Sequence, residues 1–245
     1  HLTVLIDDVQ REETEAMIAQ VSSEARIHIV KLAQIDWVSK VQKDFPPFKL
    51  GRFYVYGNFA RDTVPGNHYP LLIDAVAAFG TGEHATTAGC LLALESIKKR
   101  RSSVNGVLDV GCGTAILGIG AARLWKSVHI HACDNDPVAV GVSRVNLRAN
   151  AIQSRAQAWV SDGYKYRPIQ KLAKQEIVVA NILARPLMRM ARNAAQKLAP
   201  GGVLILSGLL TEQENMVLAA HRLQGLYLKK RLRRGKWSVL VLAQS

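Results

Sequence analysis

Cysteine, aromatic and acidic residues are all scarce in this chain of 245 residues, and each shortage narrows what the protein can be. Cys90, Cys112 and Cys133 have no CxxC spacing and leave one thiol over in any disulfide scheme, so we expect buried thiols in a reducing compartment. No run approaches the roughly 20 apolar residues of a membrane-spanning helix. No basic N-terminal patch precedes an apolar stretch, so no signal peptide is predicted. We expect a cytoplasmic protein without membrane contact.

Hydrophobic and basic residues, by contrast, are abundant. Hydrophobic residues make up 49% of the chain, which is enough for one large α/β domain and a small companion. The net charge of +13 is typical of a surface that contacts a polyanion such as nucleic acid. Two clusters, 98–101 and 229–236, hold much of this charge, and each also has a local explanation, as a helix C-terminus and as the solvated turn of a hairpin. A weak RNA contact is therefore one interpretation of these clusters.

The N-terminal part has the pattern of a strand, an amphipathic helix and a second strand over residues 2–32. Two strands are too few for independent stability, so this unit is either half of a domain or an appendage packed on the main one. Because His1 already lies in a strand-like run, we expect an upstream portion to be missing. A short helix is predicted over 36–43. Residues 51–70 begin with the strand-like aromatic residues Phe53, Tyr54 and Tyr56 and continue with Gly, Asn, Asp and Pro, so we interpret them as a connecting stretch between domains.

After residue 71, strands and helices alternate. Helices are predicted over residues 85–98, 116–125, 137–150, 184–198 and 212–223, and strands over 107–110, 128–133, 156–160, 176–180, 203–207, 226–232 and 237–242. The predicted helix 184–198 is closed by Pro200-Gly-Gly202. This order predicts an α/β fold, a doubly wound and mostly parallel sheet that ends in an antiparallel hairpin.

The chain is organised around a glycine turn between a strand and a helix. Val107 to Val110 have the pattern of a buried strand, Gly111 and Gly113 end it, and helical spacing resumes at Ile116. The bare backbone of such a loop can approach a ligand closely. A dinucleotide fingerprint needs a small residue at position 116, so Ile116 disfavours an NAD dehydrogenase. An adenosyl ligand, another nucleotide and a structural turn remain open from the spacing.

Polar side chains follow two further strands, at Asp134 and Asn181. Ligands of open α/β sheets lie beyond the carboxyl ends of the strands, at the switch point. Asp134 comes roughly 20 residues after the glycine loop, where a carboxylate can accept the ribose hydroxyls. Helix N-capping is the alternative for both residues, although Asp136 fits the cap before Pro137 better than Asp134 does.

The stretch 79–87 is a glycine-rich turn that leads into a helix. Thr87 and its neighbour Thr86 are either ligands or helix-start residues, and Phe79 is either a site residue or part of the core. His84 either lines a pocket or packs within the turn. The alternatives at this turn remain open from the residues alone.

Four stretches together resemble the PrmA family of bacterial methyltransferases, which trimethylate amines of ribosomal protein L11. They are Phe79-Gly-Thr-Gly-Glu-His-Ala-Thr-Thr87, Leu108-Asp-Val-Gly-Cys-Gly113, Asp134-Asn-Asp-Pro137 and Ala180-Asn-Ile-Leu183. The likeness extends from residue 72 to the end, and residues 36–37 and 52–56 resemble the family's linker. Ala75-Val76 replaces a Pro-Gly pair of the family, and Ala115 replaces a glycine.

The resemblance implies a Rossmann-like, class I methyltransferase that uses S-adenosylmethionine and releases S-adenosylhomocysteine. It assigns the reaction to Asn181 and Ile182, and it assigns cofactor binding to a larger set. That set is Phe79, Thr81, Thr87, Gly111, Gly113, Asp134 and Asn181. No metal is implied, and His129 and His131 on one strand face have no third ligand in the sequence pattern.

The resemblance also implies a division of the chain. Residues 1–50 would form a small α+β domain that recognises the substrate, 51–74 a linker, and 75–245 the catalytic domain. Only about the second half of the family's N-terminal β-α-β-β-α-β domain is visible in the sequence. We expect a monomer.

The chemistry of methyl transfer agrees with these residues. An in-line displacement at a sulfonium requires mainly alignment in a dry site, and desolvation lowers the pKa of a lysine amine. No strong base is needed, and Asn181 with the carbonyls after it could orient the amine. Enzymes acting on planar amides or base amines commonly place Pro-Pro-aromatic after this Asn, whereas Ile182-Leu183 favours an alkyl amine.

Two other functions remain as hypotheses, both motivated by the charge. One is an S-adenosylmethionine-dependent RNA methyltransferase. The other is a non-catalytic RNA-binding module that kept the fold, which would bind RNA with steep salt dependence and would not bind S-adenosylmethionine.

Overall fold

The computed structural model describes residues 46–73 and 85–244. The chain divides into two compact units, 1–40 and 41–245, and every described element belongs to the second. The strand-helix-strand unit predicted within 2–32, the helix predicted over 36–43 and the turn 79–84 lie outside the described residues.

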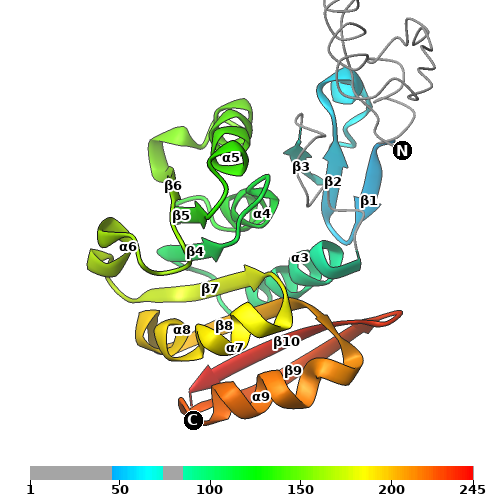
Figure 1. Cartoon of the computed structure of the whole chain (residues 1–245). Helices are drawn as coiled ribbons and strands as arrows, with labels where there is room; N and C mark the ends of the chain where they lie inside the picture. The colour runs from blue at the N-terminus through cyan, green and yellow to red at the C-terminus, as the bar shows by residue number, and fades with distance from the viewer. Residues whose placement is uncertain (1–45, 74–84, 245) are drawn as a thin grey trace, which may run out of the picture. The chain divides into compact units, whose positions relative to one another are not determined.

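A seven-stranded sheet forms the centre of the second unit, with the order β6-β5-β4-β7-β8-β10-β9 (Figure 1). The pairs from β6 to β8 are parallel, and β10 runs antiparallel to both β8 and β9. The strands are β4 (Gly106–Val110), β5 (His129–Asp134), β6 (Ala156–Val160), β7 (Gln175–Asn181), β8 (Leu198–Leu210), β9 (Leu226–Arg234) and β10 (Trp237–Gln244). The predicted doubly wound sheet with a final antiparallel hairpin is confirmed.

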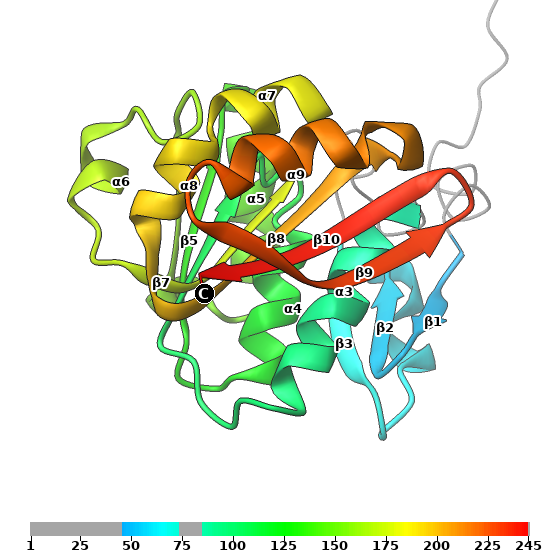
Figure 2. The same ribbon diagram turned by 90° about the horizontal axis from the view of Figure 1, so that it is seen from below.

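Helices cover both faces of this sheet (Figure 2). One hydrophobic core joins α3, α4 and α5 to the first face, and a second joins α6, α7, α8 and α9 to the other. The α-helices are α3 (Ala85–Lys98), α4 (Ile116–Leu124), α5 (Pro137–Ala149), α6 (Arg167–Lys171), α7 (Ala184–Arg189), α8 (Ala191–Lys197) and α9 (Glu214–Arg222). The 3-10 turns are η1 (Asn58–Thr63), η2 (Gln153–Arg155) and η3 (Thr211–Gln213). Because helices lie on both faces, the central strands β4 and β7 are mainly apolar.

Two predicted elements near the C-terminal half were wrong in detail. The predicted helix 184–198 is divided at Met190, whose φ of −96° and ψ of 5° interrupt the helix where its side chain packs against Gly163. The residues Pro200-Gly-Gly202 do not lie between a helix and a strand, because β8 already begins at Leu198. The helix predicted over 85–98 and the strand predicted over 156–160 are confirmed.

The predicted connecting stretch 51–70 is more ordered than expected. Together with its neighbours it forms a three-stranded sheet of β1 (Phe48–Leu50), β2 (Phe53–Tyr56) and β3 (Tyr69–Leu72), in which β2 pairs antiparallel with β1 and parallel with β3. Phe53 and Val55 are fully buried and belong to the same core as α3 and α4. Burial of these apolar side chains gives the stretch its structure.

Buried polar contacts fasten β3 to the helices below it. The Asn150 side chain, after the end of α5, accepts from Leu72 N at 3.2 Å and donates to Leu72 O at 2.7 Å. Arg123 of α4 donates to Pro70 O at 2.9 Å and to Asn150 Oδ1 at 3.1 Å. A single buried amide therefore satisfies both backbone groups of the last residue of β3.

Replacing Asn150 with alanine would leave these backbone groups unpaired. We expect Asn150→Ala to lower the free energy of unfolding by about 2–4 kcal/mol, since each buried unsatisfied group costs about 1–3 kcal/mol. Urea unfolding measures this change. The control is Arg148→Ala on the exposed surface of α5, which should change stability by less than about 0.5 kcal/mol. Equal effects of the two substitutions would contradict the link through Asn150.

Candidate functional site

A cavity of about 310 Å³ lies at the carboxyl ends of β4, β5, β7 and β8. The strand order reverses between β4 and β7, which is the switch point where open α/β sheets bind ligands. The cavity is lined by Thr86, Thr87, Gly111, Cys112, Gly113, Ile116, Leu117, Asp134, Asn135, Asn181, Ile182, Leu183, Gly208 and Trp237.

The glycine loop after β4 has a backbone that only small residues tolerate. Gly111 and Gly113 have φ angles of 70° and 53°, in the left-handed region that favours glycine. A Cβ on Gly111 would collide with the side chain of Ile182. Ala115, the N-cap of α4, is also left-handed with φ of 62°, so alanine adopts here a conformation that favours glycine.

Hydrogen bonds hold the loop from α5. Ser143 donates to Gly113 O at 2.7 Å, and Asn146 donates to Thr114 O at 3.0 Å. Both donor side chains are fully buried. The Cys112 thiol lies 3.2 Å from the Ser143 hydroxyl, and burial raises the pKa of Cys112. A neutral thiol is a weak nucleophile, so we interpret Cys112 as a small residue that fills the loop.

Asp134, at the end of β5, lines the cavity and is only partly buried. Its Oδ2 accepts from Gly113 N at 2.9 Å and its Oδ1 accepts from Asp136 N at 3.1 Å. The helix cap of α5 is Asp136, which accepts from Val138 N at 2.8 Å. The capping alternative for Asp134 is therefore wrong. Its carboxylate links the end of β5 to the glycine loop.

Asn181, at the end of β7, reaches across the cavity to α3. Its Nδ2 donates to Thr87 Oγ1 at 3.1 Å. The N-cap of α7 is Leu183 without a side-chain cap, so Asn181 does not cap this helix. The next residue, Ile182, donates its backbone N–H to Ser207 O at 3.1 Å. Asn181 and Ile182 are thus fixed to the elements on either side of β7.

The structure brings six of the predicted site residues to one cavity. They are Thr87, Gly111, Gly113, Asp134, Asn181 and Ile182. Phe79 and Thr81 lie outside the described residues. Two lining residues lie in segments that the sequence did not associate with the site, Gly208 of β8 and Trp237 of β10. The available signal for Gly208 was a glycine at the end of a predicted strand, while Trp237 comes from the distant C-terminal hairpin.

His129 and His131, the strand histidines considered as metal ligands, do not line the cavity, and His84 lies outside the described residues. His131 stacks on Trp159 with ring centroids 5.7 Å apart, and its burial lowers its pKa. Within 46–73 and 85–244, no three His, Cys, Asp or Glu side chains are grouped as metal ligands. In the same ranges no helix is long and apolar enough to cross a membrane.

Solved structures with the same arrangement are methyltransferases. The chain resembles a ribosomal protein L11 methylase from Lactobacillus delbrueckii subsp. bulgaricus with a TM-score of 0.70 and 22% identity, over 81% of this chain and 97% of that one. It resembles a 16S rRNA N2 G1207 methyltransferase of T. thermophilus, solved with AdoMet and guanosine, with a TM-score of 0.56 and 22% identity, over 69% and 45%. The fold is that of the class I, S-adenosylmethionine-dependent methyltransferases.

Sequence comparison gives the family within this class. The family model described as ribosomal protein L11 methyltransferase (PrmA) matches residues 3–245. The L11 methyltransferase of Caulobacter sp. (strain K31) is 39% identical over 233 residues, 94% of this chain and 80% of that protein. That of Brucella suis (strain ATCC 23445 / NCTC 10510) is 36% identical over 241 residues, 98% and 84%. The chain belongs to the ribosomal protein L11 methyltransferase family.

Asp109 lies directly beneath the glycine loop and is 1% exposed. Its Oδ2 accepts from Gly118 N at 3.0 Å, whereas its buried Oδ1 has no hydrogen-bond partner among the described residues. Burial raises the pKa of this carboxyl from 3.8 to about 7. The folded protein therefore retains a proton between about pH 4 and 7 that the unfolded chain releases, and stability falls as the pH rises through that window.

Replacing Asp109 with asparagine removes this dependence while keeping an acceptor for Gly118. From pH 5 to pH 8 we expect wild type to lose roughly 2–3 kcal/mol more of its free energy of unfolding than Asp109→Asn loses, since each pKa unit corresponds to about 1.4 kcal/mol. Urea unfolding at the two pH values measures the difference. If the difference in free energy of unfolding between Asp109→Asn and wild type were the same at pH 5 and pH 8, a raised pKa for Asp109 would be contradicted.

Proposed function

We propose that this chain transfers methyl groups from S-adenosylmethionine to lysine or N-terminal amines of ribosomal protein L11. The observation that supports it is the meeting of the glycine loop, Asp134 and the Asn181–Leu183 segment around one cavity in a member of this family. The L11 methyltransferase names of the relatives support the choice of substrate.

The residues around the cavity fit the adenosyl group of the cofactor. Gly111 and Gly113 leave the backbone bare where the ligand must approach, and the carboxylate of Asp134 is held beside them by Gly113 N. Each carboxylate oxygen has more than one acceptor site, so Asp134 can accept ribose hydroxyls as well as the N–H groups of Gly113 and Asp136. Apolar side chains, Ile116 and Leu117 among them, complete the wall.

The acceptor amine would lie beside Asn181. The bond from Asn181 Nδ2 to Thr87 fixes the amide plane and leaves Oδ1 to accept an amine proton. Ile182 and Leu183 offer alkyl surface without an aromatic ring, which fits the stem of a lysine. Trp237 adds an apolar wall from the hairpin, and apolar surroundings favour the neutral amine.

S-adenosylmethionine supplies a methyl group on a positively charged sulfur. The amine lone pair forms the new C–N bond while the electrons of the C–S bond remain on sulfur, and the extra amine proton leaves to solvent. The protein aligns the two partners, and alignment alone can supply several kcal/mol of the barrier reduction. No side chain needs to act as a strong base.

Three finer expectations belong to the same proposal. Residues 1–50 would recognise L11, with residues 51–74 as the linker to a catalytic domain of residues 75–245. The protein would act as a monomer in the cytoplasm, which is supported by three buried free thiols. The exposed basic residues of 229–236 would provide at most a weak RNA contact.

Mutations can separate the proposed role of Asp134 in cofactor binding from the role of Asp136 as the cap of α5. Asp134→Ala should weaken S-adenosylmethionine binding by about 1–3 kcal/mol, the scale of a hydrogen bond to a charged group. Asp136→Ala should leave this affinity unchanged and lower stability by about 1 kcal/mol through loss of the α5 cap. Titration calorimetry and thermal unfolding measure the two quantities. Unchanged affinity in Asp134→Ala would remove Asp134 from the cofactor site.

The substrate is tested by intact-mass spectrometry of purified L11 after incubation with enzyme and cofactor, followed by site mapping. Wild type should add methyl groups to amines of L11. Asn181→Ala should slow transfer by ten- to a hundredfold, about 1.4–2.7 kcal/mol, with little change in melting temperature. Asp162→Asn, in an exposed ion pair, is the matched control and should retain full activity. Labelling of naked RNA in preference to L11 would favour the RNA methyltransferase instead.

A further inference from the structure

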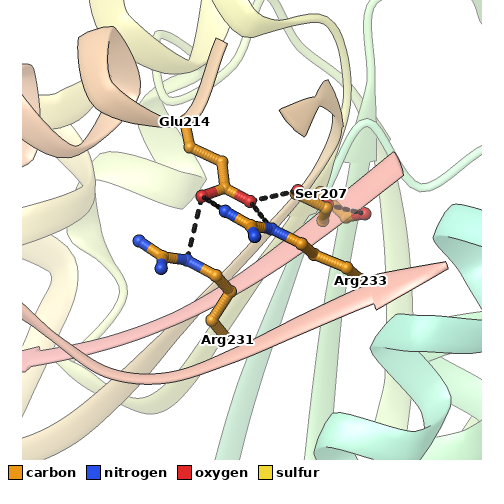
Figure 3. A network of polar contacts seen from close by, with 5 residues as sticks. Ser207, Glu214, Arg231 and Arg233 are labelled. Atoms are coloured by element: carbon orange, nitrogen blue, oxygen red, sulfur yellow. Dashed lines mark hydrogen bonds and ion pairs between the residues drawn. The ribbon is translucent and has the colours of Figure 1, made fainter. Parts of the chain in front are cut away.

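A buried carboxylate lies under the C-terminal hairpin, on the side of the sheet covered by α9 (Figure 3). Glu214, the first residue of α9, is 2% exposed, yet the neighbouring Arg233 holds its pKa below the usual value. Arg233 donates twice to it, with Nε to Oε1 and Nη2 to Oε2 each at 2.8 Å. Arg231 Nε lies 2.9 Å from Oε2. Glu214 is therefore a charged, fully paired group.

A third donor connects Glu214 to the inside of the sheet. The hydroxyl of Ser238, which is fully buried in β10, donates to Glu214 Oε1. The register of β10 on β8 shifts between Ser238 and Leu240, so the strands bulge at this point. Ser207 of β8 donates its hydroxyl to Ser238 O at 2.9 Å. Glu214, Ser238 and Ser207 thus fasten the irregular part of the β8–β10 pairing.

This irregular part touches the candidate site directly. Ser207 O accepts the backbone N–H of Ile182. The next residue, Gly208, has φ of 81°, and a Cβ there would collide with the backbone of Ile182. The same hairpin places Trp237 in the cavity wall. A displacement of Ser207 or Gly208 would therefore move the segment on which the acceptor amine is proposed to lie.

We propose that Glu214 is a positioning residue for methyl transfer, which acts through Ser238 and Ser207 to fix the backbone of Ile182. This inference rests on the function proposed above, because it assigns the Ile182 segment to the acceptor side of the cavity. Glu214 itself does not touch the cavity. Its loss should impair turnover more than cofactor binding, since the glycine loop and Asp134 are held by other contacts.

The two sides of the Glu214 cluster allow a matched pair of variants. Ser238→Ala removes the link toward the site, is nearly isosteric, and leaves both arginine pairs. Arg231→Gln removes an ion pair on the outer side, where the arginine side chain is 37% exposed, and leaves the link to Ser238. Glu214→Ala removes both charge and link, and Ser238→Ala decides the case if that variant does not fold.

With L11 as substrate, we expect Ser238→Ala and Glu214→Ala to lower kcat at least tenfold while the Kd for S-adenosylhomocysteine changes less than threefold. Arg231→Gln should keep kcat within twofold of wild type. In Ser238→Ala the NMR amide signal of Ile182 should shift, whereas that of Gly113 should not. An equal fall in kcat for Ser238→Ala and Arg231→Gln, or losses that merely follow melting temperature, would overturn the proposal.

The NMR measurement needs no substrate and separates the two claims. If wild type methylates no amine of L11 but the Ile182 signal moves in Ser238→Ala, the substrate assignment fails and the structural link remains. If L11 is methylated and neither kcat nor the Ile182 signal responds to Ser238→Ala, the positioning role of Glu214 fails while the proposed function remains.

Discussion

The cavity depends on how closely Ile182 lies to two glycines. A Cβ on Gly111, in the loop after β4, would collide with the side chain of Ile182, and a Cβ on Gly208 of β8 would collide with its backbone. Both glycines have positive φ angles, which an alanine would adopt only at a cost of about 1–2 kcal/mol even where space is available. The residue after β7 thus lies directly against the loop after β4 and against β8, because neither glycine carries a side chain.

Much of the fold follows from local pattern. The strict alternation of buried strands and amphipathic helices after residue 84 predicts the doubly wound sheet, because only a parallel sheet with helices on both faces buries such strands. The local sequence pattern did not predict the secondary structure where tertiary packing determines it. Residues 51–70 have the composition of a connection, but burial of Phe53 and Val55 makes strands of them, and Met190 divides one predicted helix through its contact with Gly163.

The sequence predicted those parts of the site that lie at the ends of strands. Asp134 and Asn181 were predicted because a polar residue directly after a buried strand must lie at the ligand edge of a parallel sheet. Gly208 and Trp237 were missed because their place depends on a bulge between β8 and β10, which neither strand shows in its own pattern. Glu214 was also missed, because an acidic residue at the start of a helix is commonly explained by its favourable interaction with the helix dipole.

β9 is one of the two edge strands of the seven-stranded sheet. The side chains exposed on it are mainly basic, Lys229, Lys230, Arg231, Arg233 and Arg234. An unpaired edge strand is a template on which a second copy of the chain could add its own edge. Paired edges would lie about 4.8 Å apart, well inside the Debye length of about 8 Å at physiological salt. The two rows of positive charge would repel, so the hairpin that closes the cavity also ends the sheet and opposes its growth into fibres.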